Sequence, residues 1–149
     1  PSQRAFCWRC SADRTKKRPA FQPDAFSFAK ITYGGVNYKV TRVGAKACAG
    51  SRSLKKISIG KYVSLIEKKA FYSCTGLTKV IIPNGVKEIP EKAFYCCSKI
   101  EKVIIPASVE KIGDYAFGGC DALGNVVIPN KQCSVGINAF YSIKGQVIR

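Results

Sequence analysis

The stretch Ala70-Phe71-Tyr72-Ser73-Cys74-Thr75-Gly76-Leu77-Thr78-Lys79-Val80-Ile81-Ile82-Pro83 decides the fold, because the chain repeats it at a fixed interval. The Ala-Phe pair that opens it returns at 93–94, 116–117 and 139–140, each time after 23 residues, and a weaker copy opens at Ala47. A fixed period of this length is typical of solenoids, in which each unit buries its apolar edge only against its neighbours. The sequence therefore predicts repeat units at 47–69, 70–92, 93–115 and 116–138, with a partial unit at 139–149.

Each unit contains a short predicted strand, which ends at a proline in the units at 70–92, 93–115 and 116–138. In the unit at 70–92, Val80 and Ile82 share one face of the strand, because strand side chains alternate between faces. Pro83 cannot donate a ladder hydrogen bond and is expected to end the strand. Stacked at about 4.8 Å, such strands form a parallel sheet. A column of phenylalanines is expected to close the core beneath a short helical or 3-10 turn, and its members are Phe71, Phe94, Phe117 and Phe140.

The residues before the repeats are expected to form a cap and an arm. In 24–46, apolar residues from Phe26 to Ile31 precede Gly34-Gly35, which supplies the positive φ values of a tight turn, and an alternating strand follows. This pattern predicts a β-hairpin that caps the first coil, since a solenoid must cover its end. Residues 1–23 lack apolar periodicity and are expected to form an extended basic arm. The candidate binding residues of this arm are Arg4, Trp8, Arg9, Arg14, Lys16, Lys17 and Arg18.

The charge of the chain is unusual for a folded array of repeats. It carries 25 Lys and Arg residues against 9 Asp and Glu residues, for a net charge of +16. Residues 1–69 hold 16 of the basic and 3 of the acidic side chains, so that +13 of the +16 lies there. An excess concentrated at one end favours an acidic partner, either a protein surface or a nucleic acid. Simple solubility is the alternative.

The eight cysteines favour buried thiols over a disulfide framework. Cys74, Cys97 and Cys120 occupy one position of the repeat, where cysteine serves as a small buried hydrophobe. Cys7 and Cys10 form a Cys-x-x-Cys pair, but the chain has no histidine and no second pair to complete a zinc site. We therefore expect no metal. Reduced cysteines favour an intracellular or organellar location, with a secreted or cell-surface location as the alternative.

The pattern Ile-x-x-x-Ala-Phe-x-x-Cys-x-x-Leu-x-x-Val-x-Ile-Pro-x-x-Val resembles the BspA-type leucine-rich repeat, and the resemblance covers roughly residues 36–149. It implies a curved, mainly β leucine-rich-repeat solenoid, with its parallel sheet on the concave side, that serves in protein recognition. Many members of that family are surface or adhesion proteins of bacteria and protists. The family has no catalytic motif to carry over.

Strand alternation places two positions of each unit on the outer, concave side of the sheet. One is a lysine column and the other is largely apolar, and a contiguous exposed apolar stripe usually marks a contact site. The alternative is that β propensity and solubility alone explain both columns. The candidate partner-binding residues are Lys56, Lys79, Lys102, Ser58, Ile81, Ile104 and Val127. A second candidate surface, on the convex turn, is the set Tyr72, Tyr95 and Tyr141.

These features predict a non-catalytic interaction or structural subunit that docks its solenoid and basic arm onto an acidic protein within a larger assembly. The alternatives are an adhesion or recognition module of a secreted repeat protein, and backbone-type RNA or DNA binding within a ribonucleoprotein. No enzyme activity is expected, because the chain lacks histidine and a glycine-rich phosphate loop. We expect no cofactor and no small-molecule ligand. No membrane span is expected, since no run approaches about 20 apolar residues.

Overall fold

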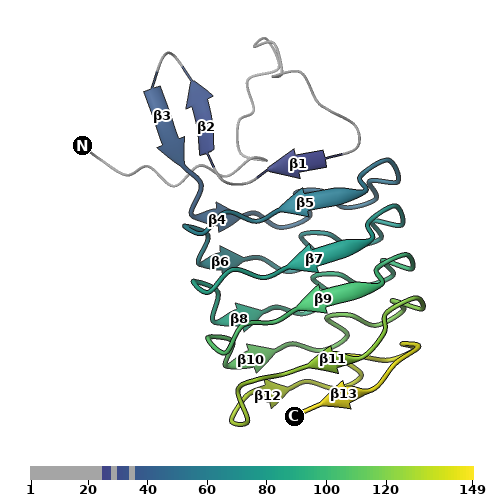
Figure 1. Cartoon of the computed structure of the whole chain (residues 1–149). Helices are drawn as coiled ribbons and strands as arrows, with labels where there is room; N and C mark the ends of the chain where they lie inside the picture. The colour runs from purple at the N-terminus through teal and green to yellow at the C-terminus, as the bar shows by residue number, and fades with distance from the viewer. Residues whose placement is uncertain (1–24, 28–29, 34–35) are drawn as a thin grey trace.

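The structure, a computed structural model, describes residues 25–27, 30–33 and 36–149, with side chains described from Lys39 onward. Over that part of the chain it is a parallel β-solenoid of about five coils. Figure 1 shows short strands in two upright columns, which we call the first and the second strand column. Register partners such as Lys79 and Lys102 are one period of the sequence apart, so each repeat forms one coil. The predicted mainly β solenoid is confirmed.

The first strand column is built from the predicted strand of each repeat. Its strands pair in parallel in the order β1-β5-β7-β9, and β11 pairs with β13 farther down the same column. This is the sheet that the sequence places on the concave side. The strands are β1 (Ala25–Ser27), β5 (Lys56–Ser58), β7 (Lys79–Ile81), β9 (Lys102–Ile104), β11 (Val126–Val127) and β13 (Val147–Ile148).

From β8 on, each strand of the second strand column follows a proline that comes after a strand of the first, at Pro83, Pro106 or Pro129; before β6, Gly60 takes this place. The two-residue strands of this column also pair in parallel, β4 with β6 and β8 through β10 to β12. From β4 to β10, each strand buries its second residue and exposes its first, as alternation requires. The strands are β4 (Arg42–Val43), β6 (Leu65–Ile66), β8 (Glu88–Ile89), β10 (Lys111–Ile112) and β12 (Ser134–Val135).

The N-terminal hairpin forms where expected, but it is shorter than expected. Strands β2 (Lys30–Tyr33) and β3 (Val36–Lys39) pair antiparallel on either side of Gly34-Gly35. The assignment of Phe26 to this hairpin is wrong, because β1 pairs in parallel with β5, with Phe26 opposite Ile57. β1 thereby satisfies the edge of β5 that would otherwise lie open. The basic arm, and with it every candidate residue from Arg4 to Arg18, lies outside the described residues.

The segment that carries each Ala-Phe pair is a run of tight turns, and the predicted helical or 3-10 turn is wrong, since the described residues contain no helix. The Phe71 amide donates to the Ala93 carbonyl of the next coil at 2.9 Å, whereas the Tyr72 amide donates to the Lys69 carbonyl of its own turn at 3.1 Å. A helix needs every amide to bond within the segment. Lys69 (φ 58°) and Ser73 (φ 56°) separate successive turns with left-handed backbone, which helices do not contain.

The core is a single apolar cluster that runs through all coils. Phe71, Phe94 and Phe117 have no exposed surface and stack at centroid distances of 5.0 and 5.2 Å. Phe140 continues the stack at 5.4 Å from Phe117 and is only partly buried. The predicted phenylalanine column is therefore confirmed. Burial of each complete aromatic side chain stabilises the fold by about 1.5–3 kcal/mol relative to exposure.

The cysteines of the repeat also lie in the core. Cys74, Cys97 and Cys120 are buried and free, as predicted, and the structure describes no disulfide in its part of the chain. The Cys97 thiol donates to the Phe71 carbonyl at 3.1 Å, which satisfies its polar hydrogen inside the core. Burial raises the pKa of Cys120 to about 12, so this thiol is protonated and unreactive at neutral pH.

Candidate functional site

The outer side of the first strand column carries the predicted lysines. Lys56, Lys79 and Lys102 are exposed, and they are register partners in successive strands. Parallel strands lie about 4.8 Å apart, so the three side chains leave the sheet in a closely spaced row. Between each lysine and the next outward residue stands a buried Ile or Val, which attaches the strand to the core.

An apolar stripe runs beside the lysines on the same side of the sheet. Ile81 is 47% exposed, Ile104 is 41% exposed and Val127 is 53% exposed, which is unusual for side chains of this type. Ile81 and Ile104 are register partners, so the stripe is continuous from β7 to β9. Ser58 occupies the equivalent, exposed position in β5. The structure thus brings all seven sequence-predicted residues together on the exposed side of the first strand column.

The lysines of the first strand column have no carboxylate partner among the described residues. Ion pairs in this part of the chain instead join side chains on and beside the second strand column. Lys111 pairs with Glu88 at 3.0 Å, and Lys87 pairs with Glu110 at 2.7 Å. Glu101, which is exposed just before β9, forms no ion pair with a described residue. The first strand column therefore carries positive charge that the described chain leaves uncompensated.

Two carboxyl groups near the second strand column bond to basic side chains of neighbouring coils. Glu67 accepts the Ala45 amide at 2.7 Å and the Arg42 side chain at 2.6 Å, and these bonds hold the pKa of Glu67 below its usual value. Lys68 bonds Glu91 at 3.1 Å and lowers the pKa of that carboxyl group as well. Each pair joins adjacent coils, so these side chains are already ion-paired within the stack.

The tyrosine set of the sequence divides in the structure. Tyr72 and Tyr95 lie side by side on the turn side of the solenoid, with ring centroids 5.5 Å apart and an interplanar angle of 20°. Tyr141 is 62% exposed in a later coil, and Gly118 takes the equivalent position in the coil between. The predicted set is therefore a pair and a separate third member.

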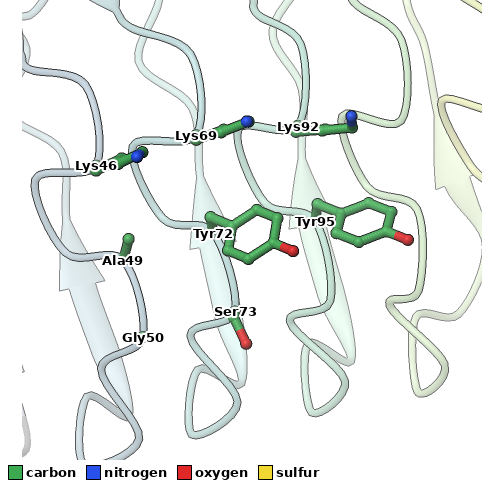
Figure 2. Close-up of a pocket in the computed structure, with 8 residues that line it drawn as sticks. All are labelled: Lys46, Ala49, Gly50, Lys69, Tyr72, Ser73, Lys92 and Tyr95. Atoms are coloured by element: carbon green, nitrogen blue, oxygen red, sulfur yellow. The ribbon is translucent and has the colours of Figure 1, made fainter.

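An open groove of about 550 Å³ lies against this tyrosine pair, and sequence reasoning missed it. Figure 2 shows its lysines in one row and the two tyrosine rings in a second, parallel row. The signal was present in the sequence, because lysine recurs at one repeat position in three successive coils. The residues that line the groove are Lys46, Ala49, Gly50, Lys69, Tyr72, Ser73, Lys92 and Tyr95.

The described side chains offer surfaces for contact. Within residues 39–149, no group of three or more His, Cys, Asp or Glu side chains is placed to hold a metal ion. That part of the chain also has no helix that is long and apolar enough to cross a membrane. What the exposed groups can supply is ammonium charge, aliphatic surface and aromatic rings, which are the chemistry of recognition.

Comparisons with known proteins agree with this architecture. The chain matches the family model for the BspA type leucine rich repeat region over residues 20–146, in six copies. Its fold is similar to that of a leucine-rich repeat protein from Bacteroides ovatus, with a TM-score of 0.76 and 29% identity over 88% of this chain and 35% of that one. It is also similar to the T. pallidum leucine rich repeat protein, with a TM-score of 0.72 and 32% identity over 80% of this chain and 55% of that one. No curated protein matches the chain.

A third similar structure is a leucine rich cell surface protein from Faecalibacterium prausnitzii, with a TM-score of 0.53 and 24% identity over 81% of this chain and 47% of that one. At that identity the likeness shows the fold alone. The chain spans between about a third and about half of the length of these three proteins. They share a repeat fold of structural and interaction proteins, and none supports the predicted intracellular or organellar location.

Proposed function

The chain belongs to the BspA-type leucine-rich repeat family, and we propose that it is a non-catalytic recognition module that docks its first strand column onto an acidic protein surface. The observation that carries this proposal is the row of uncompensated lysines at Lys56, Lys79 and Lys102, beside the exposed stripe from Ile81 to Val127. An acidic protein surface with apolar patches is complementary both to the lysine row and to the apolar stripe.

The lysine row and the apolar stripe have different roles in this proposal. Exposed charges raise the rate of encounter with an oppositely charged partner, but each exposed ion pair contributes only about 0–1 kcal/mol. The apolar stripe supplies the desolvated centre that holds the complex, because buried apolar contact carries most of the binding free energy. A partner strand or loop that lies along the column would contact Ile81, Ile104 and Val127 in succession.

We place this module at the cell surface or in a secreted protein. The support is the family together with the similar structure that is described as a cell surface protein. Since the chain spans only part of its relatives, the module is proposed as one segment of a longer array or a larger assembly. The basic arm, with Trp8 and residues from Arg4 to Arg18, adds a second positive surface toward the same acidic partner in this proposal.

The test compares the two strand columns at equal charge. One variant carries Lys56→Gln, Lys79→Gln and Lys102→Gln, and its matched control carries Arg42→Gln, Lys87→Gln and Lys111→Gln. Both lose three positive charges, so nonspecific charge effects are equal. Retention on immobilised ovalbumin, an acidic protein, is measured in a salt gradient. The first variant is expected to elute at distinctly lower salt than the control.

Equal elution of the two variants contradicts the docking surface, because retention then follows net charge only. The role of the apolar stripe is tested separately with Ile104→Ser, which should shorten retention at high salt, where charges are screened. The arm is tested by deletion of residues 1–23. If that deletion leaves retention unchanged, the arm makes no electrostatic contact with the partner.

A further inference from the structure

We propose a second, independent binding site on the turn side of the first coils, where the groove binds a linear acidic polysaccharide. In this site the sugar rings lie on Tyr72 and Tyr95, and the carboxylate or sulfate groups of the polysaccharide contact Lys46 and Lys69. The site goes beyond the proposed protein-docking function, since it uses neither the lysines nor the apolar stripe of the first strand column.

The groove exists because one coil lacks a ring. Ala49-Gly50 occupy the place that Tyr72-Ser73 take in the next coil and that Tyr95-Cys96 take in the coil after it. The tyrosine row therefore begins beside a small side chain and a glycine, and this step leaves an open volume of about 550 Å³. Ligand-binding clefts usually span roughly 300–1,000 Å³.

The two tyrosines form an aromatic platform. Their rings are half-buried and nearly parallel, with centroids 5.5 Å apart and an interplanar angle of 20°. Figure 2 shows both rings with their faces turned to the viewer, along the row that starts at Ala49. Gly118 of the next coil lies against the Tyr95 ring, since a Cβ there would be 3.2 Å from the ring. The C–H groups of a pyranose pack on such an aromatic face.

The lysine row runs parallel to this platform. Lys46, Lys69 and Lys92 have positive φ values of 55°, 58° and 54°, so the same backbone conformation presents each side chain at the same place in its coil. Lys92 lies 3.6 Å from the Glu91 carboxylate. Lys46 and Lys69 have no carboxylate partner among the described residues, and an anion at the groove would form charge-assisted hydrogen bonds with both.

The spacing of the rows favours a polysaccharide over other linear polyanions. Both rows repeat once per coil, at about the 4.8 Å that separates parallel strands. A 1,4-linked pyranose chain advances by nearly this distance per sugar, so each of the two tyrosines would receive one ring. The anionic groups of successive sugars point to alternate edges of such a chain, so one of them would face Lys46 and Lys69 together. An extended peptide repeats on one face only every ~6.6–6.8 Å. A stacked nucleic-acid strand carries one phosphate per roughly 3.4 Å. Neither matches the coils.

The experiment measures binding of size-defined oligosaccharides to the full chain by calorimetry, at about 0.15 M salt. An oligogalacturonate presents carboxylates, a heparin oligosaccharide presents sulfates, and maltohexaose is the neutral control. At least one acidic oligosaccharide is expected to bind, and the stronger of the two identifies the anionic group. Maltohexaose is expected to bind at least about tenfold more weakly, which corresponds to ~1.4 kcal/mol.

The variants copy residues that the chain itself has at equivalent positions, so each is compatible with the coil. Lys46→Asn with Lys69→Asn follows Asn138, which has a φ of 52° at this position, and Tyr72→Ala follows Ala49. Each change should weaken binding of the acidic oligosaccharide about tenfold or more. Tyr72→Phe keeps the ring and should bind within about twofold of the parent chain, which separates stacking from loss of fold.

The matched control is the variant Lys56→Gln, Lys79→Gln, Lys102→Gln, which loses more charge but from the other surface. It should bind the oligosaccharide within about twofold of the parent chain. The proposal is overturned if this control loses as much affinity as the groove variants, if maltohexaose binds as well as the acidic oligosaccharides, or if an oligothymidylate of equal length binds more tightly. Because the ovalbumin comparison changes lysines of the first strand column and none of the groove, either site can fail while the other stands.

Discussion

The two strand columns of one solenoid differ in how they balance charge. Both are parallel, both present alternate side chains outward, and both share one core. On the second column, Glu88 is the register partner of Lys111 and is bonded to it. On the first, Lys79 has Lys56 and Lys102 as its register partners. One surface is thus neutralised within the stack, and the other is left to be neutralised from outside.

In the proposed function, position within the stack, more than total charge, distinguishes the recognition surface. Two unit charges at 4 Å interact by about 1 kcal/mol in bulk water, so the lysine row carries a modest repulsion that a bound anion relieves. The same number of lysines on the second strand column would not attract an anionic partner, because carboxylates of adjacent coils already pair with them. The comparison can be tested by changes in the shared core and in either column.

The largest effect is expected from the core that supports both columns. Phe94→Ala removes a fully buried ring from the middle of the stack and should lower the free energy of unfolding by about 3–5 kcal/mol. Urea denaturation followed by circular dichroism measures this loss. Phe140→Ala, at the half-buried end of the same column, is the matched control and should cost clearly less. A loss below about 1 kcal/mol for Phe94→Ala would contradict its place in the core.

A reciprocal exchange of charge tests the comparison itself. Lys79→Glu places a carboxylate between two lysines of the first column and should stabilise the chain by about 0.5–1 kcal/mol. Glu88→Lys places a lysine beside Lys111 on the second column and should destabilise it by a similar amount. Thermal unfolding at low salt measures both changes, and 1 M salt should reduce both. If both variants shift stability in the same direction, the two columns do not differ as described.

The smallest effect concerns how the stability that Glu67, near the second strand column, contributes depends on pH. The pKa of Glu67 is lowered in the folded chain by the Ala45 amide and the Arg42 guanidinium. A carboxyl group of this kind contributes stability above its unfolded pKa of about 4.3, and that contribution is lost as pH falls through the folded value. Glu67→Gln should therefore be less stable than the parent chain at pH 7, by up to ~1 kcal/mol after solvent screening.

The difference between Glu67→Gln and the parent chain should shrink as the pH falls from about 4.3 through the lowered folded pKa of Glu67, below which both side chains are neutral. Lys79→Gln on the first column serves as control, since it removes no carboxylate and should show no such convergence. Stability curves from pH 2 to pH 7, obtained by urea denaturation, provide the measurement. A constant offset for Glu67→Gln across this range would show that its bonds do not depend on ionisation.

Much of this architecture could be predicted from the chain alone, because it rests on local rules that repeat. The period sets the coil, alternation selects Lys79 and Ile81 for the outside and Val80 for the inside, and the recurrent phenylalanine must be buried somewhere. The helical turn was predicted wrongly for a reason that is not local. Its amides bond alternately to the next coil, and a turn considered in isolation does not contain that second set of acceptors.

By itself, then, the sequence determined the repeat, the core columns and the outward row of lysines at Lys56, Lys79 and Lys102. Only the tertiary structure decided that β1 pairs with β5, that second-column charges find partners in neighbouring coils, and that Ala49 opens a groove beside Tyr72. The physical reason is distance along the chain. Alternation and period act between near neighbours, whereas pairing, screening and the shape of a groove depend on residues about one coil or more apart that meet only when the coils stack.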